Sequence, residues 1–158
     1  MTTLAPLTWL SVATGRLAIG HRPKVAALPG LGADGCTHVV TLLAEREGAA
    51  AVGAAVRAAG LGWIWWPLAN GDPLPRARDG EARAFLASLL AVLTDGSGVY
   101  VHCAAGIHRT GMLAYALLRQ AGLDAGAARA ALRRLRAVTA DGVKDVRLAW
   151  GDRLADRA

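Results

Sequence analysis

The chain of 158 residues contains few cysteines, few aromatic residues and no long uninterrupted apolar run. Its two cysteines, Cys36 and Cys103, cannot build a disulfide framework, so we expect a reducing compartment. No apolar run reaches the roughly 18 residues needed to cross a bilayer. Met1 to Gly20 also lacks the basic start and apolar core of a signal peptide. These absences predict a cytoplasmic protein without a membrane span.

Acidic residues are the scarcer charged class, since 12 Asp and Glu oppose 18 Lys and Arg, for a net charge of +6. Positive charge steers anionic substrates toward a pocket. Aromatic residues make up only 5% and do not interleave with the basic residues as base-stacking groups would, so we expect no nucleic-acid partner. The densest basic cluster lies on a helical pattern over 124–138, where we expect a solvated face formed by Arg129, Arg133, Arg134 and Arg136.

Length and the alternation of patterns predict one domain over residues 1–158. Short apolar runs that read as strands alternate with Ala- and Leu-rich helical stretches, which predicts an α/β fold with a mostly parallel central sheet flanked by helices. The expected strands lie within 7–19, 37–43, 63–66 and 99–101. The expected helices lie within 24–35, 45–60 and 79–93, and three helical stretches follow the strand at 99–101, the first of them beginning near residue 110.

The strongest motif is the segment between the strand at 99–101 and the helix that begins near Thr110. Open α/β sheets bind ligands in such loops at the carboxyl ends of their strands. A helix N-terminus and a tightly wound loop point several amides at one place, which forms a concave nest for an anion. We expect an oxyanion to be held there by the loop residues Ala104, Ala105, Gly106, Ile107, His108 and Arg109.

Three side chains suit that loop to chemistry on a phosphoryl group. Arg109 can grip two oxygens with its planar fork. Cys103 can attack, because helix N-termini and nearby cations favour the nucleophilic thiolate form. The hydroxyl of Thr110 can donate to the sulfur and help the thiolate depart. His102 precedes the cysteine, where we expect a structural role that supports the loop.

The sequence from His102 to Gly111, His-Cys-Ala-Ala-Gly-Ile-His-Arg-Thr-Gly, resembles the signature of the cysteine-dependent protein tyrosine and dual-specificity phosphatases. The order of elements from about Gly15 to Trp150 resembles the small single-domain, cyclin-kinase-associated type. The resemblance implies hydrolysis of phosphomonoesters through a phosphocysteine at Cys103, with no metal and no other cofactor. It implies phosphorylated protein or a small aryl or alkyl phosphate as the substrate, and we favour a monomer.

The resemblance also implies a general acid on a loop some thirty residues before the cysteine. The family's acid position falls on Asn70, whose amide cannot serve as that proton donor, and Asp72 follows two residues later. We predict Asp72 as the acid, with a turn residue before Pro73 as the alternative. His108 and Asp141 are the reserve candidates, although Asp141 is better read as a helix N-cap.

Two alternatives to a tyrosine or dual-specificity phosphatase stay open. The asparagine at position 70 suits a catalytically weak phosphate-binding module. A sulfurtransferase or arsenate reductase would also use a cysteine loop, but arsenate reductases need further redox cysteines and only Cys36 is available. The loop lacks the extra lysine of phosphoinositide-selective relatives, so phosphoprotein or aryl phosphate ranks above inositol lipid.

Overall fold

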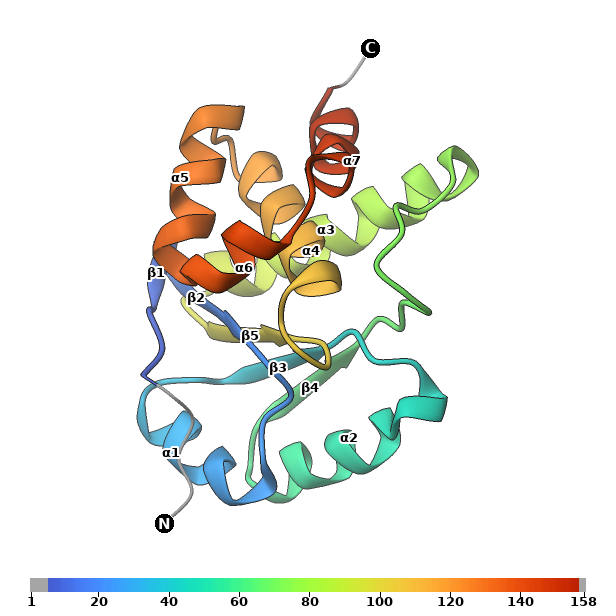
Figure 1. The fold of residues 1–158 in the computed structure, drawn as a ribbon. Coiled ribbons are helices and arrows are strands. Elements are labelled where there is room, and N and C mark those ends of the chain that lie inside the picture. Colours follow the sequence, from blue (N-terminus) through green and yellow to red (C-terminus); the bar gives the residue numbers. More distant parts are fainter. Residues whose placement is uncertain (1–5, 157–158) are drawn as a thin grey trace.

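The computed structural model describes residues 6–156, which contain a five-stranded sheet in the order β1-β2-β5-β3-β4. β1 is antiparallel to β2, and the remaining pairs are parallel, which confirms the expected α/β class with a mostly parallel sheet (Figure 1). The strands are β1 (Leu10–Val12), β2 (Gly15–Gly20), β3 (His38–Thr41), β4 (Gly62–Trp65) and β5 (Gly98–His102).

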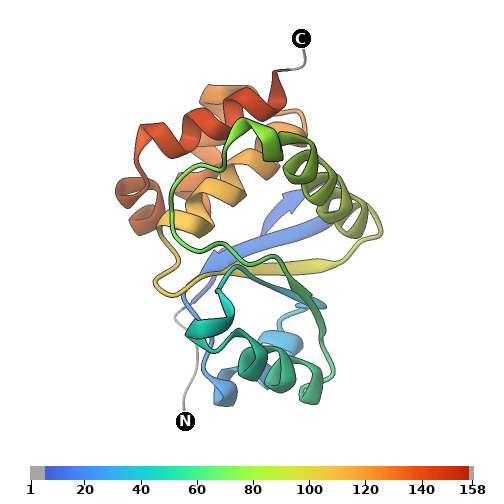
Figure 2. The same cartoon turned by 90° about the vertical axis from the view of Figure 1, so that its right-hand side faces the viewer.

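Helices cover both faces of the sheet (Figures 1 and 2). One face carries the five helices α3 (Asp79–Thr94), α4 (His108–Gln120), α5 (Ala125–Leu135), α6 (Ala137–Gly142) and α7 (Asp145–Ala155). The other face carries α1 (Leu28–Ala33) and α2 (Ala49–Ala58). Short 3-10 turns complete the chain as η1 (Val25–Ala27), η2 (Glu45–Glu47) and η3 (Arg76–Arg78).

β5 is the central strand, and its position explains why the segment that follows it is well supported. All five of its residues are buried, as expected for a strand with helices on both faces. α4 packs against it and is itself buried from Thr110 to Leu118. Each fully buried leucine or aromatic side chain contributes about 1.5–3 kcal/mol. The loop from Cys103 to Arg109, here called the cysteine loop, therefore joins a fully buried strand to a helix whose central residues are all buried.

The expected helix over 124–138 is broken at Arg136. The inward side of α5 is as predicted, with Ala128, Ala131, Leu132 and Leu135 buried. Arg136 then adopts an extended conformation, with φ −166° and ψ 109°, and α6 begins at Ala137. Asp141 lies inside α6, so its interpretation as a helix N-cap is wrong.

The helical stretch expected over 45–60 is also interrupted, by Gly48. This glycine has a φ of +87°, a conformation that side chains resist, and it separates η2 from α2. The break turns η2 toward the carboxyl edge of the sheet. No helix within residues 6–156 is long and apolar enough to cross a membrane.

Candidate active site

Cys103 lies immediately beyond β5, at the carboxyl edge of the sheet. Its side chain is buried, and the hydroxyl of Thr110 donates a hydrogen bond of 3.1 Å to Sγ. Thr110 lies in the first turn of α4 and is completely buried. The structure thus brings together the cysteine and the threonine that the sequence pairs, with a donor aimed at the sulfur.

The backbone carbonyls of the cysteine loop all find donors outside the anion nest. The carbonyl of Cys103 bonds to the ring Nδ1 of His102 at 2.9 Å, and that of Ala104 accepts from the amide of Arg22 at 3.0 Å. The carbonyls of Ala105 and Gly106 accept from Arg136 at 3.0 Å each. The carbonyl of Ile107 accepts from the amide of Gly111 inside α4 at 2.8 Å.

This arrangement fixes where the loop amides point. In a trans peptide the carbonyl and the following N–H point in opposite directions, and the structure contains no cis peptide among its described residues. Outward carbonyls at residues 103–107 therefore turn the amides of residues 104–108 toward the inside of the loop. None of those amides donates to a backbone carbonyl in the described part of the chain. Five amides that face the inside of one loop form a concave set of donors, and a tetrahedral anion is a partner that fits them.

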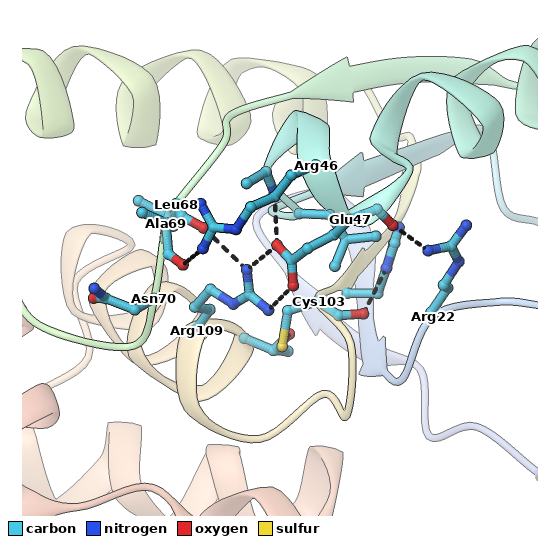
Figure 3. Close-up of polar contacts among 12 residues, drawn as sticks. Arg22, Arg46, Glu47, Leu68, Ala69, Asn70, Cys103 and Arg109 are labelled. Atoms are coloured by element: carbon cyan, nitrogen blue, oxygen red, sulfur yellow. Dashed lines mark hydrogen bonds and ion pairs between the residues drawn. The ribbon is translucent and has the colours of Figure 1, made fainter.

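Arg109 is held beside the cysteine by a residue that the sequence reading missed. Its Nη1 and Nη2 atoms form a bidentate pair with Glu47 of η2, at 2.7 and 2.9 Å (Figure 3). Nη1 also donates to the carbonyl of Leu68 at 2.9 Å. The hydrogen bonds from Arg109 lower the pKa of Glu47 to about 2, so this carboxylate is ionised at neutral pH.

Glu47 is itself fixed by its own turn. Its Oε2 accepts from the amide of Ala44 at 2.8 Å, and its backbone carbonyl accepts from Arg22 at 2.6 Å. A signal for it exists in the sequence, since an acidic residue follows β3 closely and parallel strands bring their carboxyl ends to one edge. The pairing with Arg109 spans 62 residues, so local patterns do not reveal it.

His102 is buried and belongs to a chain of hydrogen bonds that crosses three strands. Because its Nδ1 faces the Cys103 carbonyl, that nitrogen carries the proton and Nε2 is the acceptor. Nε2 lies 2.8 Å from the hydroxyl of Thr41, which in turn accepts from the indole of Trp63 at 2.8 Å. Burial lowers the pKa of His102 to about 4, so the ring is neutral at pH 7. The supporting role expected for His102 stays a prediction, and these contacts are the ones through which it would act.

The segment expected to supply the acid is the loop over residues 66–75, here called the 66–75 loop. The Oδ1 atom of Asn70 accepts from the amide of Asp72 at 2.9 Å, so Asn70 acts as a turn residue. Asp72 is exposed. A Cβ atom added at Gly71 would lie 2.8 Å from Cβ of His108, so the loop runs directly against the start of α4.

Arginines from several elements bind the carbonyls of the 66–75 loop. Besides the bond from Arg109 to Leu68, Arg46 donates to the carbonyl of Ala69 at 3.0 Å (Figure 3). From α7, Arg147 donates to the carbonyl of Gly71 and Arg153 donates to that of Leu74. The loop is therefore fixed to the same arginine, Arg109, that faces the cysteine.

The two reserve acids differ in their surroundings. His108 is exposed at the first position of α4, and its pKa is lowered by partial desolvation and by the charges of Arg147 and Lys144. Asp141 forms an ion pair with Arg133 on the neighbouring helix and is exposed. Its neighbour Gly142 abuts the side chain of Ile107, so this corner packs on the cysteine loop.

Arg136 corrects one sequence expectation. Arg129, Arg133 and Arg134 are exposed, as predicted for a solvated face. Arg136 is half-buried and reaches the cysteine loop, because the chain breaks there and turns its side chain inward. Between residues 6 and 156 no group of three or more His, Cys, Asp and Glu side chains is placed to hold a metal ion.

Comparison with known proteins finds one family model and a set of solved structures that resemble this chain. A model described as "Tyrosine phosphatase family" matches residues 73–130. The match contains the whole cysteine loop, begins just after Asp72 and ends before Arg136. No curated protein matches the chain at a significant level.

Solved structures extend the likeness to almost the full chain. Tk-PTP in its active form has 21% identity and a TM-score of 0.75, covering 96% of this chain and 100% of its own. Kinase associated phosphatase, with its catalytic-site cysteine substituted by serine, has 15% identity and a TM-score of 0.73, covering 98% and 99%. A putative protein tyrosine phosphatase from Leishmania major has 20% identity and a TM-score of 0.68, covering 98% and 99%. Residues 73–130 thus match the tyrosine phosphatase family model, and almost the whole chain shares the fold of these solved phosphatases.

Proposed function

We propose that the protein hydrolyses phosphomonoesters of the phosphotyrosine or dual-specificity type through a phosphocysteine intermediate at Cys103. The observation that carries the proposal is the cysteine loop, in which five outward carbonyls leave five amides directed at the space beside Sγ. A dianionic phosphoryl group satisfies these donors, and Arg109 can bind two of its oxygens.

In the first step the Cys103 thiolate attacks phosphorus, so that an S–P bond forms as the ester P–O bond breaks. The leaving oxygen takes a proton from Asp72, the acid that we assign to the 66–75 loop. The loop amides and Arg109 stabilise the charge on the three equatorial oxygens during this transfer. Glu47 keeps the guanidinium of Arg109 oriented through its bidentate pair.

In the second step water attacks the phosphocysteine. Asp72, now a carboxylate, accepts a proton from that water while the S–P bond breaks and inorganic phosphate forms. The departing sulfur leaves as a thiolate, which the hydroxyl of Thr110 stabilises at 3.1 Å. The chemistry assigned to these residues requires no cofactor.

The test is hydrolysis of an aryl phosphate and an alkyl phosphate by the wild type and the variants Cys103→Ser, Asp72→Asn and Asn70→Asp. We expect Cys103→Ser to abolish turnover and Asp72→Asn to slow the alkyl phosphate more than the aryl phosphate, since the poorer leaving group needs the proton. Turnover that survives Cys103→Ser overturns the mechanism. If Asp72→Asn is silent on the alkyl phosphate, the acid assignment is wrong and His108→Ala is the next variant.

One observation favours a second candidate, a phosphate-binding module with little turnover. Asn70 occupies the position that the family uses for its acid, and its side chain is engaged in the turn to Asp72. A wild type that binds phosphate without hydrolysing either ester, and gains turnover in Asn70→Asp, would support this candidate.

The substrate class that we propose is phosphoprotein or another aryl or alkyl phosphate in the cytoplasm. The cysteine loop carries Ile107 and His108 where phosphoinositide-selective relatives have a lysine. One solved structure with 19% identity and a TM-score of 0.65 is PTPMT1 in complex with PI(5)P, so lipid phosphates belong in the same assay as a comparison. We propose a monomer, which sedimentation at assay concentration tests.

A further inference from the structure

Arg136 and Thr139 contact the cysteine loop from the side opposite to the anion nest. Arg136 lies at the break between α5 and α6, and its Nη1 donates to the carbonyls of Ala105 and Gly106 at 3.0 Å each. The same nitrogen lies 3.2 Å from the hydroxyl of Thr139, which donates to the carbonyl of Gly106 at 2.5 Å. Thr139 is completely buried, so this network is built into the core of the α5–α6 corner.

The two peptides held in this way flank the residue of the loop with the greatest conformational freedom. Gly106 has a φ of +72°, and a Cβ atom there would lie 2.3 Å from the carbonyl of Gly20, so no side chain fits. Glycine can rotate its two adjoining peptide planes at little steric cost. If either plane turned over, a carbonyl oxygen would replace an amide in the nest and repel an anion.

The donors on the outer side remove that freedom. With the Ala105 and Gly106 carbonyls bound to Arg136 and Thr139, the amides of Gly106 and Ile107 face inward. The other outward carbonyls are bound by backbone amides or by His102, so these two depend on side chains from a distant helical corner. A guanidinium donor makes these charge-assisted bonds, which are stronger than neutral ones.

We propose that Arg136 and Thr139 are positioning residues that hold the Gly106 peptides in the anion-binding orientation, an inference that rests on the proposed function. Both residues contact the loop on the side away from the anion nest. Their loss should therefore weaken the binding of any tetrahedral oxyanion, whatever its leaving group. The charge of Arg136 alone is not sufficient for this role, because its Nη1 atom must reach both carbonyls.

The experiment measures tungstate binding by titration calorimetry, together with kcat and KM on an aryl and an alkyl phosphate, for Arg136→Met, Arg136→Lys, Thr139→Val and Thr139→Ser. Arg134→Met is the matched control, because Arg134 is exposed in the last turn of α5 and its loss changes the net charge equally. We expect Arg136→Met to weaken tungstate binding about tenfold or more, as losing two charge-assisted hydrogen bonds implies. The fall in kcat should be similar for both esters.

The conservative variants separate positioning from folding. Thr139→Ser keeps the hydroxyl and should retain tungstate affinity, whereas Thr139→Val should lose it, and Arg136→Lys should fall between Arg136→Met and the wild type. Amide NMR shifts of Gly106 and Ile107 should move in Arg136→Met and Thr139→Val and stay in place in Arg134→Met. Should Arg136→Met fail to fold, the comparison of Thr139→Ser with Thr139→Val, together with Arg136→Lys, tests the positioning role.

The outcomes also separate this inference from the proposed function. Tungstate affinity in Arg136→Met and Thr139→Val within about twofold of the wild type overturns the positioning role, even in an active phosphatase. A loss confined to one ester, with tungstate binding unchanged, would assign Arg136 to substrate contact and would overturn it as well. A wild type that binds tungstate but hydrolyses neither ester removes the proposed function and leaves the positioning role standing.

Discussion

Glu47 orients the guanidinium that we assign to the phosphoryl oxygens. In Glu47→Gln the neutral amide keeps one acceptor oxygen and turns an NH2 group toward Arg109, so the bidentate pair is lost. We expect kcat/KM on an aryl phosphate to fall about tenfold or more, as loss of a charge-assisted pair implies. Steady-state kinetics check this, with the exposed neighbour Glu45→Gln as a control of equal charge change. Equal rates for the two variants would contradict it.

Glu47 should also affect how the stability of the folded protein depends on pH in acid. Its folded pKa of about 2 lies below the ordinary value of 4.5, so the unfolded state takes up the proton first as pH falls. The stabilisation is therefore complete above about pH 4.5 and disappears as pH falls toward 2. Thermal melts of the wild type and Glu47→Gln should differ by a constant amount at pH 5–7 and converge below pH 4. A difference that widens in acid would refute this assignment.

Protonation of His102 should affect stability at higher pH than protonation of Glu47 does. Its folded pKa of about 4 lies below the ordinary 6.5, so the unfolded chain binds a proton between pH 6.5 and 4 that the native state excludes. Stability should fall with decreasing pH across this window, by at most about 1.4 kcal/mol per pH unit from this residue. Urea unfolding at several pH values tests it, since His102→Asn should flatten the slope. An unchanged slope in that variant would show that another group is responsible.

At the scale of elements, α7 controls the 66–75 loop through Arg147, which binds the carbonyl of Gly71. We expect Arg147→Ala to lower kcat about tenfold on an alkyl phosphate and much less on a nitrophenyl phosphate, because only the poor leaving group depends on a placed acid. The dependence of kcat on leaving-group pKa measures this directly. Lys144→Ala, an exposed cation at the start of the same helix, is the control. Equal losses on both esters would instead indicate damage to the cysteine loop.

The elements themselves were largely predictable from the sequence. The β5 strand is an unbroken apolar run and α4 follows with helical spacing, so the position of the cysteine loop between them follows from local patterns. The residues that contact that loop from distant parts of the chain cannot be predicted from local patterns. Glu47 and Arg136 reach it only because the chain breaks at Gly48 and at Arg136 itself, and these breaks depend on packing that no periodicity reports.

The assignment of the acid also has a part that the sequence predicts and a part that it does not. The family resemblance placed the acid on a loop some thirty residues before the cysteine, and the 66–75 loop lies beside Arg109 and His108. The choice between Asn70 and Asp72 depends on side-chain orientation, which spacing does not encode. The structure adds that Asn70 is occupied in a turn, and the choice of Asp72 stays a prediction for kinetics.

At the scale of the whole molecule, the sheet keeps the two cysteines apart. β3 pairs with β5 in a register that joins His38 to Val99, so Cys36 and Cys103 lie at opposite ends of neighbouring strands. The intervening strand length is about 20 Å, whereas a disulfide needs Cα atoms within about 7 Å. Burial raises the pKa of Cys36 to about 11, which keeps this thiol protonated.

We therefore predict that peroxide oxidises the protein at Cys103 without forming an internal disulfide. Cys36→Ser should be oxidised at the same rate as the wild type, since a protonated buried thiol is a poor nucleophile. Peptide mapping by mass spectrometry should find oxidised Cys103 and unmodified Cys36. A thiol-reversible product that disappears in Cys36→Ser would disprove this separation.

The hydrogen-bond chain from Trp63 through Thr41 and His102 to the Cys103 carbonyl links an indole ring on the edge strand to the backbone of Cys103. Any ligand that shifts the Cys103 peptide changes the polarity felt by the Trp63 N–H. The protein thus contains an internal optical probe, and in a variant that keeps Trp63 as its sole tryptophan, fluorescence would report occupancy of the anion nest without a label.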